Sequence, residues 1–132
     1  MKKYSVIVLV CLLTVVAFLF SACGSKSFEL DNITKIEITN GSTGETAEVT
    51  EAEDIQSITQ MFIDVSFKKG SSSADSTGWS YRVRFYQGDK FAADITVLGE
   101  VRISHNGYFY DVESGTIDTG YLAEVIDAAR NQ

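Results

Sequence analysis

The chain has 132 residues, with 18 acidic and 11 basic side chains and a net charge of −7. This acidic balance argues against nucleic acid as a partner, because phosphate binding requires basic surfaces. The chain contains two cysteines and one histidine. It therefore cannot supply four cysteine and histidine ligands to a closed zinc site.

The first residues have the layout of a secretory signal peptide. Lys2 and Lys3 precede an apolar run over residues 6–20, and small residues follow at Ser21 and Ala22. A basic start, an apolar stretch and a small-residue cleavage site define such a signal. The sequence therefore predicts a signal peptide at residues 1–22.

The motif Phe20-Ser21-Ala22-Cys23 resembles the lipobox of bacterial lipoproteins, with Phe20 where leucine is usual. The resemblance implies lipidation of Cys23 with a diacylglyceryl group carrying acyl chains such as palmitate. The protein would then be anchored to the cell membrane on its extracytoplasmic face. Two other interpretations stay open. Residues 4–22 are long enough to cross a bilayer as an uncleaved anchor, or the protein is secreted and Cys23 is incidental.

Removal of the signal would leave nine basic and 18 acidic residues, a net charge near −9. Such a chain is not expected to lie flat on anionic lipid, and two acyl chains would hold it without a basic patch. Cys11 would leave with the signal, so no disulfide is expected. We expect the lipidated cysteine and a flexible tether at residues 23–32. The remaining residues, 33–132, are long enough for one domain.

The first half of the domain predicts a hairpin followed by a helix. Residues 33–39 alternate apolar and polar side chains, Asn40-Gly41 is a common hairpin-turn dipeptide, and residues 45–49 form the return strand. A capping box between Thr50 and Glu53 then predicts a helix over about residues 51–63. Its core stripe consists of Ile55, Ile58 and Phe62.

The second half predicts a strand meander. A short strand at residues 65–69 and a polar loop at 70–78 come first. Strands follow at 79–86 and 91–97, and a hairpin at 101–105 and 108–112 turns around Asn106-Gly107. The residues expected to face the core from the first two of these strands are Trp79, Tyr81, Val83, Phe85, Phe91, Ala93, Ile95 and Val97.

A final helix is predicted over residues 120–130, capped by Asp118 or Thr119. Its core stripe consists of Leu122, Val125, Ile126 and Ala129. Strands joined by tight turns form an antiparallel sheet, and two helices can cover one face of it. The predicted class is therefore α+β: a curved antiparallel sheet of about six or seven strands with two helices packed on one face.

Several segments of the domain also carry a resemblance. The runs ITKIEITNG, EVTEAEDIQSI, GWSYRVRFY and HNGYFY are similar to those of small uncharacterised one-domain lipoproteins of Gram-positive bacteria. The resemblance covers most of residues 33–130. It implies an extracytoplasmic lipoprotein with no assigned activity, and it carries over no catalytic residue.

No catalytic set is expected. Ser104 and His105 are adjacent on a predicted strand, so their side chains point to opposite faces, and no Gly-x-Ser-x-Gly elbow is present. Residues 111–115 are read as an acidic strand end. A weak surface calcium site is the alternative there, although Gly115 falls one position too early for the EF-hand pattern. We therefore expect no enzyme, no catalytic residue, no metal site and no cofactor.

The candidate binding surface is the outward face of the strand at residues 79–86, where Arg82, Arg84 and Tyr86 alternate. Arginine and tyrosine are favoured at recognition sites. The alternative is that these arginines pair with cross-strand acids such as Asp94. The sequence thus predicts a non-enzymatic binding or accessory domain with a protein or cell-envelope partner. The alternative function is an inhibitor or immunity-type protein that blocks an enzyme or toxin.

Overall fold

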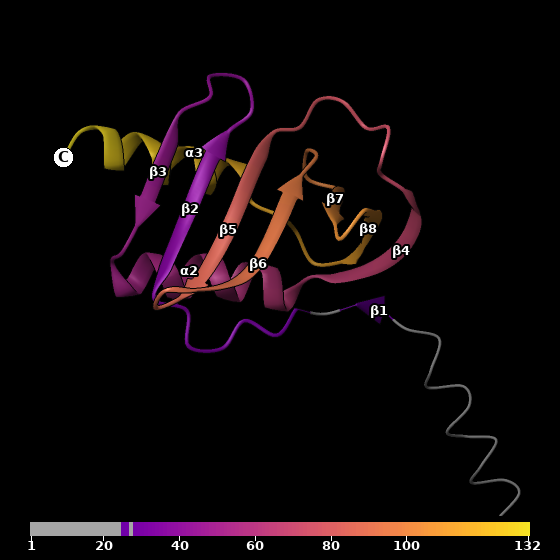
Figure 1. The fold of residues 1–132 in the computed structure, drawn as a ribbon, viewed down its shortest axis with the longest axis horizontal. Helices are drawn as coiled ribbons and strands as arrows, with labels where there is room; N and C mark the ends of the chain where they lie inside the picture. The colour runs from indigo at the N-terminus through magenta and orange to yellow at the C-terminus, as the bar shows by residue number, and fades with distance from the viewer. Residues whose placement is uncertain (1–24, 27) are drawn as a thin grey trace, which may run out of the picture.

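The computed structural model describes residues 25–26 and 28–132 (Figure 1). The predicted signal peptide at 1–22 and the predicted lipidation site Cys23 lie outside these residues. In chain order, the elements are β1 (Ser25–Lys26), β2 (Lys35–Asn40), β3 (Thr46–Val49), α2 (Ala52–Asp64), β4 (Ser66–Ser72), β5 (Tyr81–Gln87), β6 (Lys90–Val97), β7 (Arg102–His105), β8 (Tyr108–Ser114) and α3 (Thr119–Arg130).

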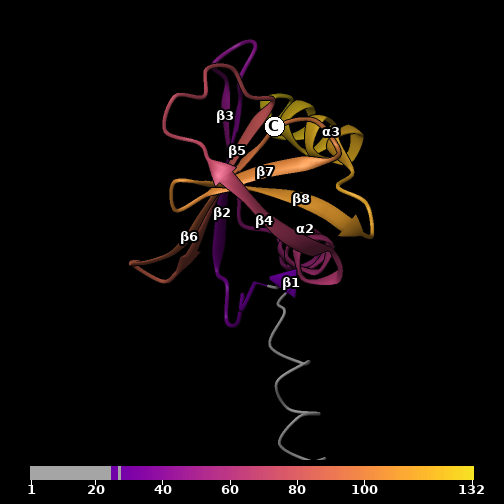
Figure 2. The same cartoon turned by 90° about the vertical axis from the view of Figure 1, so that its right-hand side faces the viewer.

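All strands join one open antiparallel sheet in the order β1-β4-β8-β7-β6-β5-β2-β3. Figure 2 shows the sheet edge-on, with α2 and α3 on the same side of it. The predicted α+β class, a curved sheet with two helices on one face, is confirmed. The two-residue strand β1 brings the number of strands to eight rather than six or seven.

The core lies between the sheet and the helices. Alternate strand residues such as Ile36, Ile38, Val83 and Phe85 are fully buried. Phe62 of α2 meets Phe85 edge-on, with ring centroids 5.7 Å apart. The remaining buried helix residues are those of the predicted stripes: Ile55, Ile58, Leu122, Val125 and Ile126. Sequence periodicity therefore identified the buried face of both helices.

The predicted flexible tether at residues 23–32 is wrong over the part that the structure describes. Ser25–Lys26 pairs with β4, and Phe28 and Leu30 are buried in the core. Phe28 packs edge-on against Phe67 and His105, with ring centroids 5.7 and 5.0 Å away. The folded domain thus includes described residues that precede residue 33.

Two aromatic residues expected in the core are exposed. Trp79 precedes β5 and is 39% exposed, and Phe91 is 52% exposed. In the pairing of β5 with β6, Phe85 lies opposite Ala93 but Tyr86 lies opposite Phe91, so Ala92 is an extra residue. Such a bulge reverses the facing of the residues beyond it. Phe91 consequently points to the helix-free face.

The helix termini agree in part with the predictions. At α3, the side chain of Asp118 accepts a hydrogen bond from the Tyr121 N–H at 2.9 Å, so the predicted cap is confirmed. At α2, the N-terminal cap residue is Glu51, and no side chain caps the helix. The predicted Thr50–Glu53 capping box is therefore wrong, because the helix begins one residue later than that motif requires.

The β7–β8 turn has the backbone conformation that its Asn-Gly sequence predicts. Asn106 and Gly107 have φ angles of 50° and 83°, as a two-residue hairpin turn requires, so the predicted hairpin is confirmed. The predicted loop at 70–78 starts later, because β4 continues to Ser72. Neither helix of the described residues is long and apolar enough to cross a membrane.

Candidate functional site

The helix-free face of the sheet carries a row of charged side chains. On neighbouring strands, Glu37 lies opposite Arg84, and Arg84 lies opposite Asp94. Arg82 and Lys35 occupy other outward positions of β5 and β2. These residues alternate with the buried ones, so the same period-two pattern that builds the core places the charges outside. We call Lys35, Glu37, Arg82, Arg84 and Asp94 the sheet-face cluster.

The two arginines are bound by cross-strand acids. Nε of Arg82 lies 3.0 and 3.1 Å from the two carboxylate oxygens of Asp94, and Nη2 binds the same carboxylate. Nε of Arg84 is 3.8 Å from Asp94 Oδ2, and its Nη1 is 3.9 Å from Glu37 Oε2. The hydrogen bond to Asp94 raises the pKa of Arg82. The pairing that the sequence left as the alternative is therefore present.

Tyr86 joins this cluster to an aromatic pair. Its hydroxyl donates to Glu37 Oε2 at 3.2 Å, and Lys35 Nζ lies 4.4 Å from its ring centroid. The ring of Phe91 packs edge-on against it at 5.7 Å. The sequence predicted that Phe91 faces the core. The alternation of apolar and polar residues along the strand does not reveal the bulge at Ala92.

The cluster holds three basic and two acidic groups, so it is net positive on a strongly acidic protein. About two-fifths of each arginine side chain is exposed, at 41% for Arg82 and 37% for Arg84. Their guanidinium groups contact the acids, and part of each side chain stays exposed to solvent. Such ordered arginines beside exposed aromatics are the composition of recognition surfaces.

The structure does not bring the candidate catalytic residues together. Ser104 Oγ bonds Ser73 Oγ at 2.8 Å. His105 Nδ1 instead lies 2.9 Å from the carbonyl oxygen of Asp94, and its ring contacts Phe28. The two side chains thus face opposite sides of β7, as strand geometry predicts. Asp111 is bound by Arg102 Nε at 2.7 Å.

The acidic stretch at residues 111–115 is mostly strand. Residues 111–114 belong to β8, and only Gly115 follows it, with φ 86°. No group of three or more histidine, cysteine, aspartate or glutamate side chains within residues 25–26 and 28–132 is arranged to hold a metal ion. The strand-end interpretation of this stretch is the one that the structure shows.

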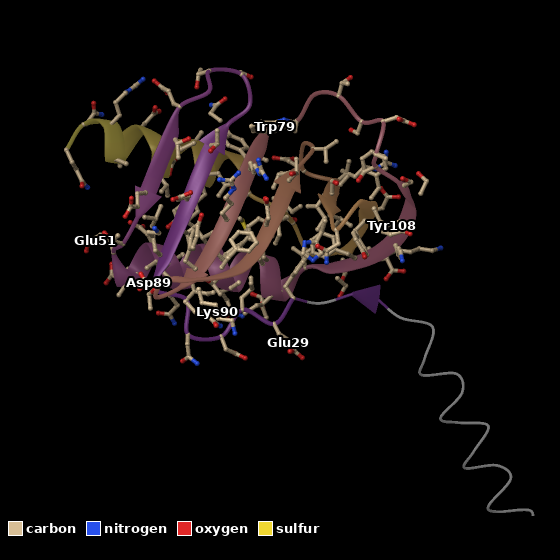
Figure 3. All side chains as sticks on the ribbon, viewed as in Figure 1. Glu29, Glu51, Trp79, Asp89, Lys90 and Tyr108 are labelled. Carbon is tan, nitrogen blue, oxygen red and sulfur yellow. The ribbon has the colours of Figure 1, made fainter. Side chains whose placement is uncertain are left out.

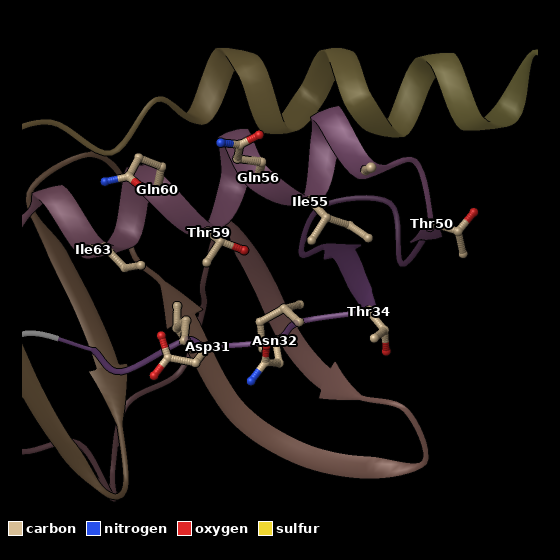
Figure 4. A pocket seen from close by; sticks show the side chains of 12 residues that line it. Asp31, Asn32, Thr34, Thr50, Ile55, Gln56, Thr59, Gln60 and Ile63 are labelled. Carbon is tan, nitrogen blue, oxygen red and sulfur yellow. The ribbon is translucent and has the colours of Figure 1, made fainter.

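An open groove of about 560 Å³ runs between α2 and the segment before β2 (Figure 4). Its polar side chains include Asn32, Thr34 and Gln60, and Ile55 and Ile63 supply apolar surface. The Thr59 hydroxyl is buried there without a hydrogen-bond partner. The lining contains no basic side chain and one acid, Asp31. It offers hydrogen-bonding surface but no acid–base pair.

The loop after β4 is a second exposed segment of the surface. Ser73 N–H donates to the carbonyl oxygen of Gly107 at 2.9 Å, and the Ser73 hydroxyl bonds Ser104. These contacts tie the start of the loop to the β7–β8 hairpin. The stretch from Ala74 to Trp79 is exposed, and it presents one charged side chain, Asp75.

No protein-family model, no curated protein and no solved structure matches this chain. Only the geometry of the helix-free face, with its sheet-face cluster, Tyr86 and Phe91, indicates what this chain can bind. That geometry defines an α+β domain with an ordered, mixed-charge surface.

Proposed function

We propose that the protein is a membrane-anchored lipoprotein whose extracytoplasmic domain binds a protein or cell-envelope partner without catalysing a reaction. Lipidated Cys23 anchors the domain, and the helix-free sheet face binds the partner. Arg82, Arg84 and Tyr86 are the principal contact residues, and Phe91 adds apolar area.

One observation carries the binding role: two half-exposed arginines form ion pairs with cross-strand acids beside exposed aromatic surface. The salt bridges of Arg82 and Arg84 with Asp94 reduce the side-chain entropy that binding would otherwise cost. Phe91 leaves half of its surface in water, and burying that surface against a partner would contribute to binding. A partner with an acidic or carbonyl-rich surface and an apolar contact fits this face.

The sequence around Cys23 supports the anchor. The small residues Ser21 and Ala22 directly precede Cys23, as they do in a lipobox. The two acyl chains of a diacylglyceryl group would supply the membrane affinity without a basic patch.

Metabolic labelling with a fatty acid tests the anchor in the full chain. The wild type and Cys11→Ser should both be labelled, since Cys11 lies within the predicted signal peptide. Cys23→Ser should be unlabelled and keep its unprocessed mass. Label on Cys23→Ser would overturn the lipobox assignment.

A photo-crosslinking amino acid tests the binding face in intact cells. Placed at Phe91, it should give a discrete adduct. Placed at Val101, which is 71% exposed on another part of the surface, it should not. The Phe91 adduct should be lost in Arg82→Ala/Arg84→Ala. Equal adducts at both positions, or an adduct that survives the arginine changes, would exclude this face.

The inhibitor or immunity-type alternative is favoured by a different observation. The two helices and their caps carry seven acids and one base: Glu51, Glu53, Asp54, Asp64, Asp118, Glu124 and Asp127 against Arg130. A basic enzyme or toxin would fit this layer. Under this alternative, Glu53→Gln/Glu124→Gln and high salt should each abolish capture of the partner. Arg82→Ala/Arg84→Ala should leave that capture unchanged.

A further inference from the structure

The end of β1 lies next to a particular part of the sheet. Ser25 is opposite Lys68 and Lys26 is opposite Phe67 in an antiparallel pairing. Ser25 is therefore the end of β1 that lies nearer to Lys69. Cys23 precedes Ser25 by two residues in the sequence, and two peptide units span at most about 8 Å.

Beyond Ser25, the edge of β4 is open. Among the described residues, β1 is the only strand on that side, and its pairing ends at Lys68. Lys68 and Lys69 are both exposed. Tyr108 of β8, which lies opposite Ser72, is 41% exposed. Lys69 Nζ lies 3.9 Å from the centroid of its ring. We call Lys68, Lys69 and Tyr108 the β4-edge patch.

This patch is basic although the protein is acidic. Asp111 is paired in register with Lys68, but its carboxylate is bound by Arg102 at 2.7 Å. The neighbouring strand β8 also carries the exposed acid Glu113. Lys68, Lys69 and Arg102 still outnumber Asp111 and Glu113 by three to two. The acids of the helices lie on other elements, so the net charge near −9 is unevenly distributed.

We propose that the β4-edge patch is the surface by which the anchored domain contacts an anionic lipid bilayer. The proposal rests on the anchoring of Cys23. The acyl chains would bring the headgroup region within reach of Lys68 and Lys69, whose ammonium groups attract lipid phosphates. Tyrosine is favoured at the membrane interface, where its ring is half immersed and its hydroxyl is solvated.

The consequence is an edge-on orientation. The domain would stand on one edge of the sheet rather than lie flat, because Lys68 and Lys69 lie at that edge. Each lysine at an anionic surface is expected to increase the population of this orientation by about fivefold. The sheet-face cluster would then point sideways along the membrane and remain accessible to a partner.

The chain has a single tryptophan, Trp79, which permits a quenching experiment on the full lipidated protein in vesicles that contain brominated lipid. Figure 3 labels Tyr108 beside β4 and Trp79 at a separate position near β5. In phosphatidylglycerol vesicles, the indole of Trp79→Phe/Tyr108→Trp should be quenched at least twofold more than that of the wild type. Equal quenching of the two indoles would overturn the proposal.

Charge reversal provides the matched control. On the Trp79→Phe/Tyr108→Trp background, Lys68→Glu/Lys69→Glu should lower the quenching severalfold in phosphatidylglycerol and have little effect in phosphatidylcholine. Lys90→Glu/Arg130→Glu changes the charge equally at exposed positions elsewhere and should have little effect in either lipid. An equal loss in both variants would mean that total charge, and not this patch, sets the orientation.

Fatty-acid labelling of Cys23 on the same preparations separates the two proposals. Unlabelled protein would refute the anchor itself. Labelled protein whose two indoles are equally quenched would refute the orientation and leave the anchor standing.

Discussion

Arg82 of β5 binds Asp94 of β6 diagonally across the two strands, and Nε of Arg82 lies 3.0 and 3.1 Å from the two oxygens of the carboxylate. Asp94 also lies 3.8 Å from Nε of Arg84. One acid thus orders two arginines on the helix-free face. The proposed binding surface depends on this shared contact, since unpaired arginines would be free to rotate away from a partner.

A double-mutant cycle of Arg82→Ala and Asp94→Ala should give a coupling free energy of about 0.5–1 kcal/mol. The pair is half-exposed, so water screens most of the Coulomb attraction. Urea unfolding of the four proteins measures the coupling. A coupling of zero would mean that the pair is not formed in solution and that the arginines are not held in place.

Phe28→Ala should destabilise the domain by about 3–5 kcal/mol, because Phe28 is buried against Phe67 and His105. Thermal or urea unfolding of the fragment 25–132 measures the effect. Glu29→Ala changes the neighbouring exposed residue and should have little effect. A fragment that starts at residue 33 should be less stable than 25–132. Equal stability of the two fragments would restore the tether interpretation.

Gly41→Ala should destabilise the first hairpin. A Cβ atom at Gly41 would lie 2.0 Å from the carbonyl oxygen of Trp79, so the backbone would have to move, at a cost of about 1–3 kcal/mol. Gly70→Ala is the control, because its Cβ would lie 3.4 Å from its nearest neighbour. Unfolding midpoints compare the two. Equal midpoints would show that the approach of Trp79 to Gly41 is not maintained in solution.

Alkaline pH should weaken the contact between the helices. Burial, followed by the hydrogen bond to Asp54, raises the pKa of Tyr121 above its usual value of 10.0. The Tyr121 hydroxyl donates to Asp54 Oδ1 at 3.0 Å, which joins α3 to α2.

The unfolded chain therefore loses this proton at a lower pH than the folded one. The stabilisation is complete below about pH 10 and declines as the pH rises through and above that value. Tyr121→Phe should show a smaller decline. Urea unfolding of both proteins between pH 8 and 11 checks this, and since lysines titrate in both, only the difference between them counts. Parallel curves would contradict the assignment.

Local pattern was sufficient for much of the fold. Three features depend only on residues close together in the sequence, and the structure agrees with each. They are the turn dipeptide Asn106-Gly107, the cap Asp118 and the helix stripe of Ile55, Ile58 and Phe62. The capping box at Thr50 failed although it is also local. A cap motif marks the region of a helix start, and tertiary packing selects the residue.

The candidate site was harder to predict than the fold. The outward positions of Arg82, Arg84 and Tyr86 follow from strand alternation, but their partners do not. Glu37 is 49 residues away from Tyr86 in sequence and reaches it only because β2 pairs with β5. Phe91 joined the surface through a bulge, and its position depends on how β6 is registered against β5.

By itself, the sequence determined the element types, the antiparallel class, the buried helix stripes and the acidic charge, because these depend on composition and on short-range periodicity. Only the tertiary structure decided that Phe28 and Leu30 complete the core, that Phe91 faces outward and that Asp94 orders two arginines. It also placed Lys68 opposite Ser25 of β1, at the edge of the sheet. Each of these outcomes depends on the pairing of strands that are distant in sequence, and pairing free energies become defined only when the whole sheet is assembled.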